Sequence, residues 1–211
     1  MENTAAHELM LLALDPNQGG RRHAQPLSYA VPVVLAAELA LQGRIRLDDG
    51  RLSVVPGNSR ELGPAMRHVL QAADKCQGKR PTAAVRKLRS GADLAVLDEL
   101  ISSSQVRRGS RTVLGLFQAD AQKVADSGRV RRLAQELARQ LDHGVADQRA
   151  LLLAWGLQIA RLERQVLGQD YRQLRRAAMD MSARGGLPAD AVALLKGGLR
   201  ARQAMESAAA S

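Results

Sequence analysis

The segment YAVPVVLAAELALQ, at residues 29–42, constrains the fold of this chain more than any other feature of the sequence. As an α-helix it would be apolar nearly all round, and a helix of that kind is normally enclosed by its neighbours on every side. Ser28 is of the type that caps a helix N-terminus, and Pro32 would then fall near the first turn, where proline is tolerated. The segment therefore predicts a central helix around which the rest of the chain packs.

The composition favours helices for the surrounding elements as well. Of the 211 residues, 45% are apolar but only 2% are aromatic. The core must therefore be built from Leu, Val and Ala, which pack well between helices. A chain of this length can bury a real core as one domain. We expect a mainly α, compact multi-helix single domain over residues 1–211, with short surface β-hairpins and flexible ends at about residues 1–6 and 206–211.

A β-hairpin is predicted directly after the central helix, over residues 44–55. Apolar and polar residues alternate on both sides of an Asp-Asp-Gly sequence, which supplies a turn that tolerates positive φ. Ile45 and Leu47 would face inward, and Leu52 and Val54 would return on the same face. A helix followed by a two-stranded wing is also the arrangement of many DNA-binding domains, so the hairpin alone leaves its role open.

A second unit of helix and hairpin is predicted further along the chain. The helix over residues 93–103 is expected to bury Leu94, Leu97, Leu100 and Ile101, and QVRRGSRTVLGLF at 105–117 reads as strand, Gly turn and strand. Matching residues indicate a weak internal repeat: Glu38, Leu39 and Ile45 correspond to Glu99, Leu100 and Val106. The other helices are expected at residues 8–14, 61–77, 82–89, 121–141, 148–167 (with Trp155 in the core), 171–183 and 189–208.

The net charge of +10 limits the binding partners. Such a surface attracts polyanions, which include nucleic acid, anionic lipid and acidic proteins. The single cysteine, Cys76, excludes an internal disulfide and a multi-cysteine metal site, as is typical of a reducing cytoplasm. The first residues lack the basic region of a secretory signal, and the longest apolar stretch is too short and too interrupted to span a bilayer. We expect a cytoplasmic protein.

Signatures of catalysis are missing from the sequence. The four histidines, His7, His23, His68 and His143, are far apart and lack metal-site spacing, so we expect each to be exposed or partly buried structure. There is no nucleophile elbow and no glycine-rich phosphate loop, and the paired Gly residues stand where helices must end. The sequence therefore predicts no enzyme, no cofactor and no metal site.

Several segments together resemble the Golgi phosphoprotein 3 family, especially its shorter bacterial members. These are ELMLLALD, LSYAVPVVLAAELALQGRIRLDDGRLSVV, DLAVLDELISSSQVRRGSRTVLGLF and DQRALLLAWGLQIARLERQVL, within residues 8–205. The resemblance implies a helical domain with surface hairpins and no catalytic activity. It also implies a peripheral adaptor that binds phosphatidylinositol 4-phosphate and the cytoplasmic tails of membrane proteins. A second copy of the chain, in a homo-oligomer, is an alternative partner.

The headgroup residues that the resemblance implies are replaced in this chain. A family Trp in the loop before the central helix corresponds to His23, an Arg in that helix to Pro32, and two further Arg residues to Ser90 and Asp93. We therefore expect weakly selective binding of anionic phospholipid in place of a site for one phosphoinositide isomer.

Basic residues beside the replaced positions form the candidate lipid site. Apolar residues that follow them in the second hairpin, Leu114 and Phe117, are candidates for membrane contact, with an inward-facing role as the alternative. The candidate lipid-binding or anion-binding residues are Arg21, Arg22, His23, Arg86, Arg89, Arg107, Arg108 and Arg111.

The main alternative is a winged-helix-like nucleic-acid-binding protein, which would also be basic and would place Arg on the wing. Against it, the helix before the first hairpin offers few polar residues besides Glu38 and Gln42. The helix before the second hairpin carries Asp93, Asp98 and Glu99, which phosphates would repel. The sequence therefore favours the membrane over nucleic acid.

Overall fold

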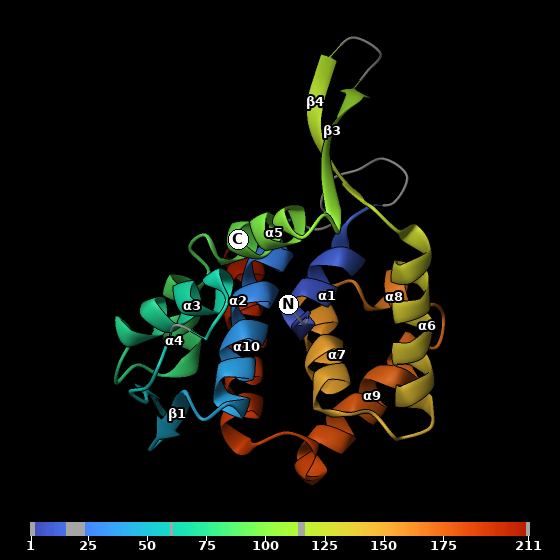
Figure 1. The fold of residues 1–211 in the computed structure, drawn as a ribbon. Helices are drawn as coiled ribbons and strands as arrows, with labels where there is room; N and C mark the ends of the chain where they lie inside the picture. The colour runs from blue at the N-terminus through green and yellow to red at the C-terminus, as the bar shows by residue number, and fades with distance from the viewer. Residues whose placement is uncertain (1–2, 16–23, 60, 114–116, 210–211) are drawn as a thin grey trace.

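A computed structural model describes residues 3–15, 24–59, 61–113 and 117–209, and confirms a mainly helical fold with two β-hairpins (Figure 1). In chain order, the elements are α1 (Ala5–Ala13), α2 (Ala24–Leu41), β1 (Ile45–Asp48), β2 (Arg51–Val54), α3 (Pro64–Asp74), α4 (Pro81–Leu88), α5 (Ala92–Ser102), β3 (Val106–Val113), β4 (Phe117–Val124), α6 (Ser127–Asp142), α7 (Gln148–Ala160), α8 (Glu163–Leu167), α9 (Tyr171–Met181), the π-helical turn η1 (Ser182–Gly186) and α10 (Ala189–Ala209).

Helix α2 is the central helix, as predicted. Residues 29–40 are buried, Leu41 is half-buried and Gln42 is exposed. Helices α1, α3, α7 and α10 all pack against it. Two glycines permit close approaches between helices, because a Cβ at Gly198 would lie 2.7 Å from Val33, and one at Gly156 would lie 2.8 Å from Leu9. A core poor in aromatic residues is thus closed by bringing helices together at small residues.

The start of α2 differs from the prediction. The helix begins at Ala24, so Ser28 lies inside it and its Oγ donates to the Gln25 carbonyl at 2.7 Å instead of capping the N-terminus. Pro32 is consequently an interior residue, not one of the first turn. Since proline has no N–H, the helical acceptor four residues earlier, at Ser28, loses its usual partner.

The first hairpin is confirmed and is part of the body of the protein. Ile45 pairs with Val54, and the turn residues Asp49 and Gly50 have φ values of 51° and 73°, as a type I′ turn requires. Leu52 is buried, and its N–H donates to the Lys79 carbonyl at 2.8 Å. This hairpin is therefore scaffold, packed between α2 and the segment that leads to α4.

The second hairpin is longer than predicted and projects from the end of the helical body (Figure 1). Gly109, interpreted as the turn, lies within β3 opposite Ala121 of β4. Residues 121–124, predicted as the start of a helix, belong to β4, and α6 begins only at Ser127. The composition of this segment suits a helix, but pairing with β3 satisfies its backbone groups instead.

The helix predicted over residues 148–167 is broken in two. Arg161 has a φ of 59°, which ends α7, and α8 starts at Glu163. Trp155 is 3% exposed and its Nε1 donates to Ser182 Oγ at 3.1 Å, which confirms its place in the core.

The two units of helix and hairpin share backbone geometry, which supports the internal repeat. Gly43 and Ser104 stand at equivalent positions and have φ values of 67° and 59°. The next N–H groups, of Arg44 and Gln105, donate to carbonyls five residues earlier at 2.8 and 2.9 Å. Both helices therefore end in the same way before their strands begin.

Candidate functional site

Glu38, in the first repeat unit, is buried and caps the N-terminus of α1. It is 8% exposed, and its Oε1 accepts a hydrogen bond from the Ala5 N–H at 2.6 Å, while Oε2 has no partner. Burial raises the pKa of this carboxyl from 4.5 to about 7, against the lowering effect of the Ala5 amide. Close to neutral pH the side chain is therefore divided between its neutral and ionised forms.

Glu99, at the equivalent position of the second unit, caps α3. Its Oε1 accepts from the Ala65 N–H at 3.0 Å, at a helix start where the N-cap Gly63 has no side chain to offer. A Cβ at Gly63 would lie 2.9 Å from that carboxylate oxygen. Glycine at residue 63 therefore gives the carboxylate access to the end of the helix, where the helix dipole favours negative charge.

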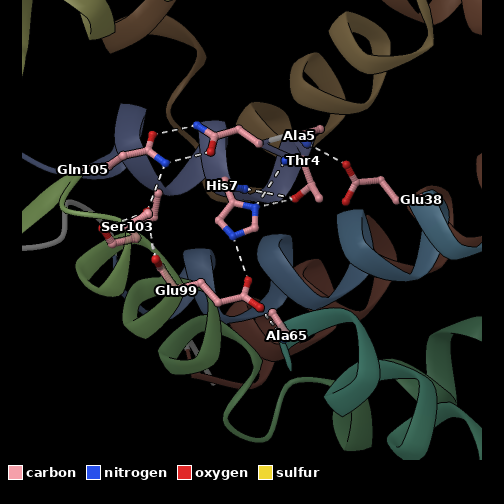
Figure 2. A network of polar contacts seen from close by, with 10 residues as sticks. Thr4, Ala5, His7, Glu38, Ala65, Glu99, Ser103 and Gln105 are labelled. Carbon is pink, nitrogen blue, oxygen red and sulfur yellow. Dashed lines mark hydrogen bonds and ion pairs between the residues drawn. The ribbon is translucent and has the colours of Figure 1, made fainter. Parts of the chain in front are cut away.

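His7 distinguishes the two glutamates. Its Nδ1 accepts from the Thr4 N–H at 3.2 Å, so the ring proton is on Nε2, which donates to Glu99 Oε2 at 2.7 Å (Figure 2). Burial acts to raise the pKa of Glu99, but the hydrogen bonds from His7 and Ala65 outweigh it and lower the pKa overall. The repeat thus contains one carboxyl whose pKa is raised by burial and one whose pKa is lowered by hydrogen bonds. We expected His7 to be exposed or partly buried, but it is only 4% exposed.

The polar network continues to the root of the second hairpin. Asn3 and Gln105 exchange two hydrogen bonds of 2.8 Å, and Gln105 also donates to Ser103 Oγ (Figure 2). The Gln105 carbonyl accepts from Ala125 N–H at 2.8 Å, just beyond β4. Asn3, which precedes α1, and Ala125, which follows β4, therefore both bond to Gln105 at the point where the β3–β4 hairpin joins the helical body.

A pocket of about 490 Å³ adjoins this network. Its lining combines His7 and Glu99 with Arg44 and Glu61, beside apolar side chains that include Met66. Arg44 donates from Nη1 and Nη2 to the carbonyls of the following loop at 2.9 and 3.0 Å. The charged side chains of this pocket thus already have structural partners: Glu99 caps α3, and Arg44 bonds to loop carbonyls.

Arg89 is the candidate lipid-binding residue whose surroundings the structure defines best. It follows α4, is half-buried, and donates from Nη1 to the Tyr29 hydroxyl at 2.7 Å. Its guanidinium also lies 4.3 Å from the centre of the Tyr29 ring, over its face. Tyr29 belongs to α2, so this contact places a guanidinium beside the N-terminal part of the central helix. Arg86, one turn earlier in α4, is exposed.

Arg107 and Arg108 are exposed on β3, at the other end of α5 from Arg89. Helix α5, whose 11 residues span about 16 Å at 1.5 Å per residue, lies between the two basic groups in the chain. Figure 1 shows α5 lying across the end of the bundle from which β3 and β4 project. Arg108 forms an ion pair with Asp98 at 3.3 Å, with both side chains mostly exposed.

Leu94 was predicted to be buried, and this prediction is wrong: the residue is 51% exposed. The buried face of α5 is formed by Ala92, Val96, Leu97, Glu99 and Leu100. Position 94 lies away from that face, and Ile101 at its edge is half-buried. An exposed leucine therefore stands on α5 between the two basic groups.

The remaining candidate residues fall mostly outside the part of the chain whose side chains the structure describes. Arg21, Arg22, His23 and Leu114 lie outside the described residues, and for Arg111 and Phe117 only the backbone is described, in β3 and β4. Of the positions that replace family arginines, Ser90 uses its carbonyl as an acceptor for His68 Nε2. Pro32 is buried within α2.

The described residues contain neither a cluster of metal-binding side chains nor a helix that could span a membrane. Nowhere in residues 3–15, 24–59, 61–113 or 117–209 do three or more His, Cys, Asp or Glu side chains gather as a metal ion would require. Within the same ranges, no helix combines the length and the hydropathy needed to cross a membrane.

A sequence model of the family described as Golgi phosphoprotein 3 (GPP34) matches residues 5–196. A search among curated proteins found none that matches the chain.

Proposed function

Because the chain belongs to the Golgi phosphoprotein 3 (GPP34) family, we propose that it is a peripheral adaptor that docks on anionic membrane through α5 and the root of the β3–β4 hairpin. Membership of the family is consistent with a non-catalytic adaptor. In this proposal the protein is cytoplasmic, and it holds the tails of membrane proteins near the bilayer. The observation that carries the docking face is Leu94, exposed between Arg89 and the Arg107–Arg108 pair.

The energies of these groups suit a reversible contact. A basic side chain near an anionic bilayer contributes about 1 kcal/mol, so Arg86 and Arg107 together supply about 2 kcal/mol, while Arg108 is already paired with Asp98. Leu94 is half-exposed, and burying the remainder adds about 1 kcal/mol, half of what a fully buried leucine gives. A surface of this kind would hold the protein on the membrane at low salt and release it as screening increases.

Selectivity among anionic lipids should be weak. The positions where the family resemblance implies arginines hold Pro32, Ser90 and Asp93. A proline and a serine cannot supply the planar double donor that arginine presents to a phosphate, and an aspartate repels it. The docking face would therefore respond to the charge density of the membrane more than to the identity of one headgroup.

Vesicle co-sedimentation at two salt concentrations tests the proposal. The variant Arg107→Glu, Arg108→Glu reverses two exposed charges on β3, and Leu94→Gln removes the exposed apolar group. The matched control is Arg46→Glu, Lys75→Glu, which makes the same change of charge at exposed positions in β1 and directly after α3. Vesicles of phosphatidylserine in phosphatidylcholine are the ligand, and duplex DNA is a parallel ligand.

We expect the native protein and the control variant to bind anionic vesicles to a similar extent at low salt. The β3 variant should lose most of its binding, Leu94→Gln should lose a smaller part, and phosphatidylinositol 4-phosphate should give little more than equal charge of phosphatidylserine. Equal loss in the β3 and control variants would mean that net charge alone drives binding. Retention of DNA without binding to vesicles would restore the nucleic-acid interpretation of the hairpins.

A further inference from the structure

A second pocket, of about 330 Å³, lies where the end of α7, α8, the start of α9 and α10 meet. It uses none of the residues of the docking face. Its lining is strongly basic: four arginines contribute to it, Arg161, Arg164, Arg175 and Arg202. Glu163 is the one carboxylate among the lining residues.

Arg202 is buried without a full set of partners. The residue is 7% exposed, and neither its Nε nor its Nη1 makes a hydrogen bond. Nη1 lies 2.6 Å from Glu206 Oε1, close enough for an ion pair but without hydrogen-bond geometry. The same oxygen of Glu206 also pairs with Arg161 Nη1 at 3.2 Å. One carboxylate oxygen therefore serves two guanidinium groups.

The remaining acceptors do not complete the site. Glu163 Oε1 lies 3.8 Å from Arg175 Nη1, at the outer limit of an ion pair. Burial raises the pKa of Glu163, against the opposing effect of a backbone hydrogen bond and of the nearby arginines. Gln158 Oε1, also in the lining, is buried and has no partner. A buried guanidinium with unused donors is costly unless an anion satisfies it.

The charges indicate what kind of anion fits. Counting Glu163 and Glu206 as ionised against the four arginines leaves two positive charges in excess. Arg164, Arg175 and Arg202 come from α8, α9 and α10, and Arg161 directly follows α7, so the guanidinium donors come from four separate places in the fold. A tetrahedral dianion with several acceptor oxygens suits this arrangement better than a planar carboxylate, which one arginine can satisfy alone. Gln158 could accept a hydrogen bond from a hydroxyl carried by the same ligand.

We propose that this pocket binds a phosphate monoester, with Arg202 as the central donor and Arg161, Arg164 and Arg175 around it. The ester is carried either by a small soluble molecule or by a lipid headgroup. The proposal is independent of the docking face, because the two sites share no residue and are tested by different variants.

Isothermal titration calorimetry of the full chain, with inorganic phosphate and with glycerol 3-phosphate in chloride buffer of constant ionic strength, tests the site. The variant Arg161→Gln, Arg164→Gln changes two exposed lining residues, and the control Arg46→Gln, Lys75→Gln removes the same charge elsewhere. We expect the native protein and the control to bind glycerol 3-phosphate alike. The pocket variant should bind it at least about tenfold more weakly, the usual effect of losing charge-assisted hydrogen bonds.

Arg202→Gln provides a second test of the site. It should abolish phosphate binding, so phosphate should raise the melting temperature of the native protein, by binding the folded state, but not that of the variant. If this variant fails to fold, the exposed pair of substitutions still decides the question. The docking-face variant Arg107→Glu, Arg108→Glu should keep phosphate binding intact.

Vesicles of phosphatidic acid in phosphatidylcholine separate the two sources of the phosphate. A loss of vesicle binding by the pocket variant but not by its control indicates a lipid headgroup. Equal vesicle binding by both variants, with the difference confined to the soluble ester, indicates a free ligand. The proposal is overturned if the native protein shows no saturable binding of phosphate or glycerol 3-phosphate up to about 10 mM, or if pocket and control variants bind the soluble ester equally.

Discussion

Replacing Glu38 by glutamine should change how the stability of the protein depends on pH. The folded protein binds the Glu38 proton with a pKa of about 7, compared with 4.5 for the ordinary carboxyl, because the side chain is buried. A group whose pKa is raised by folding stabilises the folded state below the unfolded pKa. This stabilisation is lost as the pH rises through the folded pKa. The Glu38 contribution should therefore decline between pH 4.5 and about 7.

The magnitude follows from the difference between the two pKa values. One pKa unit corresponds to about 1.4 kcal/mol, so the shift from 4.5 to about 7 amounts to about 3 kcal/mol. Glutamine does not titrate, and its Oε1 can still accept the hydrogen bond from the Ala5 N–H. The free energy of unfolding of Glu38→Gln, minus that of the native protein, should therefore increase by about 3 kcal/mol from pH 4.5 to pH 8.

Urea denaturation followed by circular dichroism across this pH range measures the difference. Other titrating groups are present in both proteins, so their effects largely cancel in the subtraction. Glu61→Gln, at an exposed position, is the matched control and should give a profile parallel to that of the native protein. If the profile of Glu38→Gln is parallel to it as well, Glu38 does not retain a proton in the folded state and the reasoning is refuted.

Three further predictions test the packing and the helix caps. Gly198→Ala places a Cβ 2.7 Å from a valine of the central helix, and the strain should lower the free energy of unfolding by about 1 to 3 kcal/mol in urea titration; unchanged stability would contradict the close packing. Asp147→Ala removes the acceptor of an α7 N–H and should lower the free energy of unfolding by about 1 kcal/mol. Asp170→Ala, at an N-cap without such a bond, should lower it clearly less. Equal losses in the two variants would argue against the cap. His7→Ala leaves the Glu99 carboxylate with one donor fewer, so the free energy of unfolding at pH 7 should fall by about 1 to 3 kcal/mol. The pKa of Glu99, measured by NMR titration, should rise, and an unchanged pKa would refute the proposed pair.

Local patterns in the sequence predicted the elements whose structure is decided locally. The apolar run at residues 29–40 is buried on every side, and the Asp-Asp-Gly turn has the expected positive φ angles. Both signals act within a few residues, through side-chain spacing and backbone preference. The mainly helical class follows for the same reason, because a core of Leu, Val and Ala suits closely packed helices.

Errors arose where distant residues decide the structure. Gly109 is a turn former by type, but cross-strand pairing with Ala121 holds it in the middle of a strand. The break after α7 depends on a positive φ at Arg161, a residue type that carries no signal for it. The partners His7 and Glu99 are 92 residues apart, so nothing local links them. Likewise, the sequence gives no sign that the Nε of Arg202 is buried without a partner, because the burial results from the packing of α10 near the end of α7.

The two buried glutamates also determine how the chain end opens. Ala5 and His7, both in α1, donate to Glu38 and Glu99, so detachment of α1 would remove a hydrogen-bond donor from two buried carboxyl groups at the same time. Chain termini usually fray, and their amide hydrogens exchange quickly with solvent. Here the first helix is tied to both repeat units, so its amides should exchange only in openings that also disturb α2 and α5. The N-terminal helix would then belong to the slowest-exchanging cooperative unit of the protein, despite its position in the chain.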